Sequence, residues 1–450
     1  MIMARDRKNS AISVDSSLSS RTVTSRIAVS GDLKKYFRRL AFFSNYDAEI
    51  FANKSILAIP VLSMVLPVAW ITGADVYVDE IDRTFAESAE VLQWEYRKMY
   101  PGAPFRTRLI ADRVVDNEYA SNKTALLFSG GLDSIYSLSG NLSLKPMLVM
   151  ILGTDIPISE VAYQNAVERE YSDFAGREGL AMTFVRTDAL GILDTRRLDY
   201  LFWRFQGRFE AGFLFGIGYS LTHIGQTAPL SVGRFNRVLV AASNDEAKAH
   251  QMREYPDSSY PAEKITWANI RVELDGPIAR HEKALALKGF LKAHRFRLRP
   301  CWYASDLYSE PTQSPLLRDT VNCNVCEKCL RTIAALALAG IDPNEYGFLV
   351  NKSTFDRMKG LFQRRLMTRQ HIEVEWRPLQ EAIPVEMEED PYGVGDFFRW
   401  LHTIDLRSSA RPYESLRSKL YHRLPYPIAD LLRVVWEKTP PQRLLVALRR

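Results

Sequence analysis

Cysteine is scarce in this sequence, with only four in 450 residues. So few cysteines cannot form the disulfide framework of a small secreted domain. The excess of one sign of charge is also small, because 59 basic and 53 acidic residues leave a net charge of only +6. Residues 401–450 hold ten basic and four acidic residues, so the surplus lies in the C-terminal tail. A chain-wide basic surface for nucleic acid is therefore not expected.

The usual nucleophiles for hydrolysing glutamine are missing as well. The chain begins Met1-Ile2 and contains no Gly-x-Cys-x-Gly elbow. The seven histidines show no metal-ligand spacing. Any nitrogen donor is therefore expected to be free ammonia or an amine rather than glutamine hydrolysed on this chain.

An apolar signal segment is absent from the N-terminus. Residues 1–30 are rich in serine and lack an apolar h-region, so we predict a disordered tail rather than a secretory signal. Residues 55–74 carry no charge, but they are interrupted by Pro60 and Pro67 and followed by acidic residues. Two prolines would break an isolated span, which favours a buried strand and turn over a transmembrane segment. We expect a cytoplasmic protein.

The hydrophobic pattern divides the chain into five regions. After the tail, residues 31–120 are predicted to form a small α+β domain, and residues 340–450 a mainly helical extension with a basic tail. Between them, short apolar runs alternate with helical patterns, which is typical of a parallel sheet covered on both faces. The predicted strands are Thr124–Phe128, Met147–Leu152, Met182–Arg186, Val238–Ala242 and Ile270–Leu274. The fold class is thus α/β, with a five-stranded parallel sheet in a nucleotide-binding domain at 121–300.

A glycine-rich string follows the first of these strands. Residues 128–134 read Phe-Ser-Gly-Gly-Leu-Asp-Ser and precede a helical pattern. Glycines allow the backbone to approach an anion closely, and a helix start offers unpaired N–H groups to phosphate. Asp133 would repel a polyphosphate unless a cation bridges them, which implies Mg²⁺. An ordinary strand–helix turn is the alternative reading of the glycine pair.

The cysteines are grouped in a pattern that predicts a metal site. Cys301 is followed by Cys323-x2-Cys326-x2-Cys329 within the region 301–339. Four thiolates match a closed, structural zinc site. They also match an iron–sulfur cluster, and four buried thiols remain the plain structural alternative.

The glycine-rich string resembles the PP-loop signature of the ATP pyrophosphatase superfamily. Together with the downstream cysteines, it resembles the 7-cyano-7-deazaguanine synthase family over about residues 123–335. Three further segments carry this likeness: Pro277-x5-Lys283, Arg-Pro-Cys301-Trp-Tyr and Leu330-Arg331. The resemblance implies an adenine nucleotide alpha hydrolase-like sheet followed by a zinc knuckle. It also implies ATP, Mg²⁺ and Zn²⁺ as cofactors.

The resemblance further implies roles for individual residues. ATP would contact the loop and the end of the second strand, at Phe128, Ser129, Gly130, Gly131, Leu132, Asp133, Ser134 and Leu152. Ser129, Asp133 and Lys283 would be catalytic, and the four cysteines would hold zinc. Asp155 lies where the family's adenine pocket would be but is equally an ordinary loop acid. Arg331 either faces the site or caps the knuckle.

The expected reaction is the ATP-dependent activation of a carboxylate. A small-molecule carboxylate would be adenylated with release of pyrophosphate, and ammonia or an amine would then displace AMP to form an amide or a nitrile. Two alternatives stay open: an RNA-thiolating enzyme with a cysteine-bound iron–sulfur cluster, and a non-catalytic nucleotide-binding scaffold. The extension at 340–450 could contact a protein or RNA substrate through its basic tail, whose simplest reading is a solvated amphipathic helix.

Overall fold

The fold is built on a single wide β-sheet. The computed structural model describes residues 10–206, 212–243, 259–301, 321–365, 367, 369, 371–384, 393–410 and 424–431. Within them, ten strands form one sheet in the order β10-β9-β6-β7-β8-β3-β2-β1-β4-β5. The strands are β1 (Ala11–Ser19), β2 (Thr22–Val29), β3 (Ala41–Tyr46), β4 (Asp75–Asp82), β5 (Leu109–Val115), β6 (Thr124–Leu127), β7 (Met147–Leu152), β8 (Met182–Thr187), β9 (Arg237–Ala241) and β10 (Arg271–Asp275). The predicted α/β class is confirmed.

The five predicted strands occur within one residue of their predicted positions and are parallel to one another. They do not form a separate sheet, however. β8 continues into the N-terminal strands through an antiparallel pairing with β3, in which Ser44 lies opposite Thr187. The expected five-stranded sheet is therefore one half of a larger one, and residues 31–120 are not an independent domain.

The prediction of a disordered tail at 1–30 is wrong for the residues that the structure describes there. β1 and β2 form an antiparallel hairpin that pairs with β3 on one side and β4 on the other. Apolar and polar residues alternate along β1, so that Ile12 and Val14 are buried while Ser13 and Asp15 are exposed. This period of two is the ordinary pattern of a half-buried strand.

Residues 55–74 form buried helices rather than the predicted strand and turn. Helix α1 (Lys54–Leu57) leads into α2 (Ile59–Thr72), and every residue of α2 before Thr72 is buried. Pro60 lies in the first turn of α2, where its missing N–H has no intrahelical partner to lose. The helix also continues through Pro67 and ends at Gly73, whose φ is +71°. A helix that is apolar all round is stable when the protein encloses it completely.

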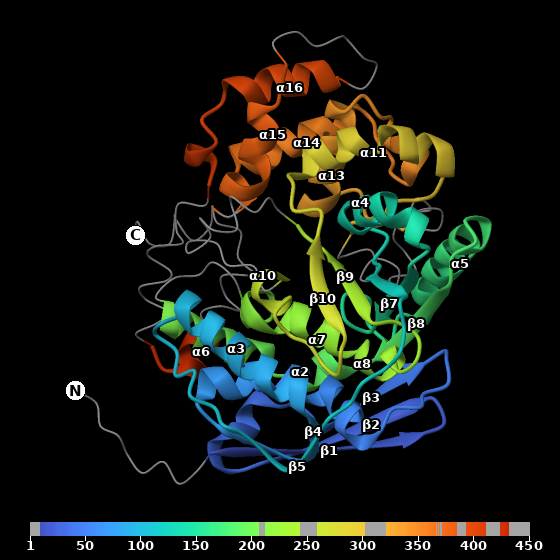
Figure 1. Ribbon diagram of the computed structural model, residues 1–450. Helices are drawn as coiled ribbons and strands as arrows, with labels where there is room; N and C mark the ends of the chain where they lie inside the picture. Colours follow the sequence, from blue (N-terminus) through green and yellow to red (C-terminus); the bar gives the residue numbers. More distant parts are fainter. Residues whose placement is uncertain are drawn as a thin grey trace.

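Helices cover the two faces of the sheet unequally (Figure 1). One hydrophobic core runs beneath both halves of the sheet and contains residues of α2, α3 (Arg83–Met99), α6 (Thr195–Gln206) and α7 (Tyr219–Gly225). The second core lies only on the parallel half, where α4 (Leu132–Asn141), α5 (Val161–Arg177) and α11 (Arg280–His294) pack. Residues of β6 and β7 alternate between the two cores, so these strands are apolar on both faces.

The C-terminal region is helical, as predicted, in its described parts. After α13 (Glu327–Leu338), which belongs to the cysteine region, residues 340–450 contribute α14 (Lys352–Gln363), a π-helical turn η7 (His371–Trp376), α15 (Arg377–Glu381) and α16 (Val394–Thr403). These helices join the second core and gather at the end of the molecule away from β1–β5 (Figure 1). Most of the predicted basic tail (Arg433, Lys438, Arg443, Arg449 and Arg450) lies outside the described residues.

Candidate nucleotide-binding and metal sites

The glycine-rich loop joins β6 to α4 in a tight turn. Gly130 has a φ of +74°, and a Cβ atom there would lie 2.1 Å from the ring of Tyr171. Only glycine avoids both the left-handed strain and this clash. The Gly131 N–H donates to the Ser129 hydroxyl over 3.3 Å, and the Ser134 hydroxyl donates to the Gly131 carbonyl over 3.0 Å. The backbone therefore turns sharply at the carboxyl end of β6, where open α/β sheets bind ligands.

The start of α4 offers a site for an anion. Gly131 is its N-cap and supplies no side-chain hydrogen bond to the first-turn N–H groups. Such groups and the helix dipole attract negative charge. Ser129 is exposed, and its hydroxyl lies 3.4 Å from that of Ser134. Both hydroxyls thus lie beside the start of the helix.

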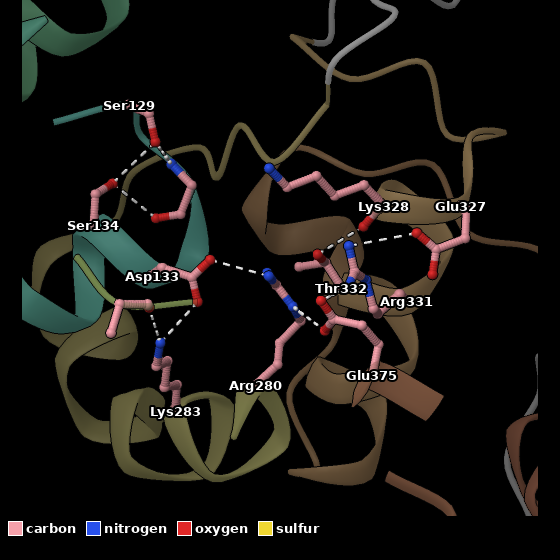
Figure 2. Close-up of polar contacts among 12 residues, drawn as sticks. Ser129, Asp133, Ser134, Arg280, Lys283, Glu327, Lys328, Arg331, Thr332 and Glu375 are labelled. Carbon is pink, nitrogen blue, oxygen red and sulfur yellow. Dashed lines mark hydrogen bonds and ion pairs between the residues drawn. The ribbon is translucent and has the colours of Figure 1, made fainter. Parts of the chain in front are cut away.

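Asp133 is held by two cations from α11 (Figure 2). Lys283 Nζ lies 3.0 Å from one carboxylate oxygen, and Arg280 Nη2 lies 3.0 Å from the other. Lys283 is fully buried and also donates to the Ala242 carbonyl. Burial raises the pKa of Asp133, but the charges of Arg280 and Lys283 outweigh it and hold that pKa well below its ordinary value.

This pairing changes two expectations about the loop. Asp133 already has two cationic partners, so its presence beside a polyphosphate does not by itself require Mg²⁺. Lys283 is brought to the site as predicted, but its ammonium faces Asp133 and the end of β9. Its direct effect in this structure is to fix the position of Asp133.

Arg299 ties the loop to the end of β7. Its backbone N–H donates to the Gly130 carbonyl over 2.7 Å, and Nε donates to the Ser129 carbonyl over 3.0 Å. Its Nη2 also lies 2.7 Å from the carboxylate of Asp155. Burial raises the pKa of Asp155, but the charge of Arg299 outweighs it and lowers that pKa. Asp155 therefore belongs to the surroundings of the loop rather than to an isolated turn.

A half-buried histidine lies beside this arginine–aspartate pair. His223 Nδ1 is 2.7 Å from the Tyr219 carbonyl, and Nε2 is 2.8 Å from the Thr154 hydroxyl. Because a carbonyl can only accept, Nδ1 carries the proton, and a neutral ring then accepts from Thr154 at Nε2. Burial lowers the pKa of His223. The sequence analysis gave this histidine no role, because spacing alone does not reveal the contact with the loop after β7.

A network of arginine and glutamate extends from Asp133 towards α13 (Figure 2). Glu375, on the turn η7, is paired with Arg331 and lies 3.6 Å from Nε of Arg280. Arg331 also lies 3.4 Å from Glu327. Arg331 thus faces the network as well as lying close to the cysteines. Burial and, to a smaller extent, the charge of Arg280 lower the pKa of Lys328 to about 8.

Several predicted nucleotide contacts can involve only the backbone. The side chains of Phe128, Leu132 and Leu152 are buried in the second core. Phe128 packs edge-on against Tyr171, with ring centroids 5.4 Å apart. These residues pack beneath the loop, whereas Ser129 is exposed.

The four cysteines come together as predicted. Their sulfur atoms all lie within 4.8 Å of one another, including 3.9 Å between Cys301 and Cys326 and 3.8 Å between Cys323 and Cys329. Tetrahedral coordination with metal–sulfur bonds of about 2.3 Å gives sulfur–sulfur distances of roughly 3.8 Å. The cluster could therefore hold a metal ion such as zinc.

Backbone N–H groups support these sulfurs. The N–H groups of Cys326 and Cys329 lie 3.3 and 3.4 Å from the sulfurs of Cys323 and Cys326, respectively. Cys326 is the N-cap of α13, so two of the cysteines lie at the start of the helix that carries Arg331. The spacer at 302–320 lies outside the described residues.

A separate groove of about 470 Å³ lies where α5 meets the N-terminal strands. Its lining includes Asn45, Gln164 and Arg186 and contains no residue of the glycine-rich loop. Arg186 is already paired with Asp47 and Glu168. This groove is a surface feature distinct from the site at α4.

The residues that the sequence analysis missed are Arg280, Arg299, Glu327, Lys328 and Glu375. Arg280 had a detectable signal, because it precedes Lys283 by three residues and therefore shares its helix face. Arg299 stands in the quoted Arg-Pro-Cys segment. Glu375 had no such signal in the sequence. It lies far from the loop along the chain and reaches Arg280 and Arg331 only through the packing of η7.

Comparisons of this chain with models of protein families, with curated proteins and with solved structures found no match. Among the helices of the described residues, none is both long and apolar enough to cross a bilayer.

Proposed function

We propose that this protein is an ATP-dependent adenylating enzyme of the PP-loop type that activates a carboxylate and forms a C–N bond. One observation carries the proposal: the Ser-Gly-Gly-Leu-Asp-Ser turn lies between β6 and α4, at the carboxyl end of a strand inside the parallel half of the sheet. That position combines backbone N–H groups, two hydroxyls and a helix start. A polyphosphate is the ligand that such a turn suits best.

In the proposed reaction, the loop amides and the hydroxyls of Ser129 and Ser134 hold the pyrophosphate end of ATP, which enters as its magnesium complex. An oxygen of the substrate carboxylate attacks the α-phosphorus, and the bond to pyrophosphate breaks. The nitrogen of ammonia or an amine then attacks the acyl carbon, loses a proton and displaces AMP. In a second round, the oxygen of the resulting amide would attack the α-phosphorus of another ATP with release of pyrophosphate, and loss of AMP and two protons would then leave a nitrile. Placement and charge neutralisation supply the rate enhancement.

The metal site would have a structural role in this enzyme. Four thiolates close the coordination shell of a tetrahedral zinc ion and leave no open position for chemistry. Sulfurs within 4.8 Å of one another enclose a single ion more readily than a cluster of several irons and sulfides. The proposed cytoplasmic location fits four adjacent thiols, which stay reduced only in a reducing compartment.

The choice of nitrogen donor follows from the position of the four cysteines. All four cysteines lie together in the proposed metal site, which leaves none of them at the loop as a nucleophile for glutamine. Ammonia or an amine is therefore the proposed donor. A deazaguanine-like carboxylate is the first substrate to test, and a larger carboxylate conjugate is the second.

The test is an assay of pyrophosphate and AMP formation from ATP, followed by ³¹P NMR, with a panel of carboxylates and ammonium. The expected result is equal release of pyrophosphate and AMP that depends on one carboxylate. Formation of ADP and phosphate instead would contradict the proposal. Binding of ATP with no AMP under any condition would favour the scaffold alternative, and a coloured protein containing iron and sulfide would favour RNA thiolation.

A further inference from the structure

Two buried arginines converge on one carboxylate beside the glycine-rich loop. Arg280 at the start of α11 and Arg331 on α13 are each about 95% buried. The carboxylate of Glu375 lies between them (Figure 2). Arg280 also reaches Asp133 in the first turn of α4, so this pair lies directly across from the start of that helix.

The glutamate satisfies only part of these two guanidinium groups. Nε and Nη1 of Arg280 and Nε of Arg331 are buried and have no hydrogen-bond acceptor among the described residues. The 3.6 Å between Arg280 Nε and Glu375 is too long for a hydrogen bond. Buried guanidinium donors without acceptors are costly, and such groups commonly indicate a ligand site.

The charges around this point also favour an anion. The network contains more basic side chains than carboxylates. The basic members are Arg280, Lys283, Arg299, Lys328 and Arg331, and the acidic members are Asp133, Asp155, Glu327 and Glu375. Bringing a substrate carboxylate next to a triphosphate requires such a surplus, because two anions would otherwise repel each other at short range.

We propose that Arg280 and Arg331 form the binding subsite for the substrate's carboxylate, in which Glu375 occupies the place that this carboxylate takes. This inference rests on the proposed function and names the residues that would hold the group to be adenylated. The position of Glu375 shows that a carboxylate fits between the two guanidinium groups. Arginine binds carboxylates through paired N–H donors, which suits the three donors left without acceptors.

Glu375 lies on a π-helical turn, which supports this interpretation. Single π-helical turns are rare and occur frequently at functional sites. A substrate carboxylate would displace the Glu375 side chain and pair with the donors that it leaves unsatisfied. The two arginines would then hold one oxygen of the substrate close to the nucleotide bound at α4.

The test measures binding of 4-(trifluoromethyl)benzoate to the full chain by ¹⁹F NMR, with 4-(trifluoromethyl)benzamide as its neutral counterpart. Both are titrated with and without α,β-methylene-ATP. The benzoate should bind and the benzamide should bind at least about ten-fold more weakly, as expected when charge-assisted hydrogen bonds are lost. Equal binding of the two compounds would overturn the proposal.

Two variants with opposite expected effects make the test specific. Glu375→Gln removes the internal competitor and should tighten benzoate binding about ten-fold. Arg331→Lys keeps the charge but loses the planar fork and should weaken it about ten-fold. Glu381→Gln, an exposed change on α15, is the matched control and should have no effect. If Glu375→Gln weakens binding or leaves it unchanged in a folded protein, the subsite proposal is wrong.

The titration with α,β-methylene-ATP distinguishes a failure of this inference from a failure of the proposed function. All three variants should bind α,β-methylene-ATP within about two-fold of the parent protein, because none touches the loop. A large loss of nucleotide affinity in Arg331→Lys would assign the arginine to the nucleotide instead and overturn the subsite. Absence of nucleotide binding in the parent protein, with benzoate binding intact, would contradict the proposed function alone.

Discussion

The fully buried Lys283 and the half-buried Asp133 form an ion pair between α11 and the first turn of α4, with 3.0 Å between Nζ and the carboxylate. This contact connects the segment after β10 to the loop after β6. It also gives the aspartate of the glycine-rich string a structural partner. The two residues therefore act together, whatever ligand the loop binds.

The first prediction concerns this pair. Asp133→Asn should lower the free energy of unfolding by about 3–5 kcal/mol, because it leaves Lys283 buried without a counter-charge. Urea unfolding at pH 7 measures the loss. Asp116→Asn, which breaks an exposed pair with Arg83, is the control and should have no measurable effect. Equal stability of the two variants would contradict the importance of the Lys283–Asp133 pair.

The pH dependence of the same pair follows from the lowered pKa of Asp133. A carboxyl with a depressed pKa in the folded state stabilises the fold above its unfolded pKa of about 3.9. The contribution is lost as the pH falls below that value. Asp133→Asn should therefore flatten the decline in stability below pH 4.

The second prediction concerns the turn itself. Gly130→Ala should abolish nucleotide binding and cost at least about 1 kcal/mol of stability, since alanine is strained at φ +74° and its Cβ would meet Tyr171. Gly140→Ala, on the following helix α4 with nothing within 4 Å of its added Cβ, should instead stabilise the protein by about 0.5–1 kcal/mol. Calorimetric titration with α,β-methylene-ATP and thermal unfolding measure the two effects. A Gly130→Ala protein that binds normally would contradict the role of the loop.

The third prediction concerns the metal. Purified protein should be colourless and contain one zinc per chain by elemental analysis. Chelation should lower the thermal midpoint, because structural zinc contributes binding free energy on the order of 10 kcal/mol to folding. Adding zinc back to the chelated protein is the control and should restore the midpoint. A metal-free protein with an unchanged midpoint would leave the cysteines as four buried thiols.

The fourth prediction concerns the pH sensitivity that His223 confers. Its folded pKa is lowered by burial, so the unfolded chain binds a proton that the folded chain does not. Stability should therefore fall as the pH drops below about 6.5, by at most about 1.4 kcal/mol per pH unit. His223→Gln should remove this part of the decline in urea midpoints between pH 7 and 5. The exposed His402→Gln variant is the control and should retain it.

The local sequence pattern was enough to predict the parallel half of the sheet. Strands buried on both faces are continuous apolar runs, and all five predicted strands occur within one residue of their expected positions. The cysteine spacing likewise predicted their assembly. These features depend on residues close together in the chain, or on a ligand set with a characteristic spacing.

Contacts between distant segments could not be predicted in the same way. Nothing local indicates that β3 pairs with β8, or that Glu375 reaches Arg331 beside the loop. The prolines of α2 led to a wrong prediction of a strand and turn, because neither Pro60 in the first turn nor Pro67 inside the fully buried helix breaks it. The tertiary core decides between a helix and a strand when an apolar run carries no periodicity.

The fifth prediction concerns the N-terminal hairpin, whose alternating pattern was overlooked among its serines. Ile12 is fully buried in the core beneath the sheet, whereas its neighbour Ser13 faces solvent. Ile12→Ala should therefore cost about 2–5 kcal/mol, because it opens a cavity between β1 and the helices below. Ser13→Ala should stay within about 0.5 kcal/mol of the parent protein. If both variants unfold at the parent's urea midpoint, β1 does not contribute to the core, and the sheet would end at β3.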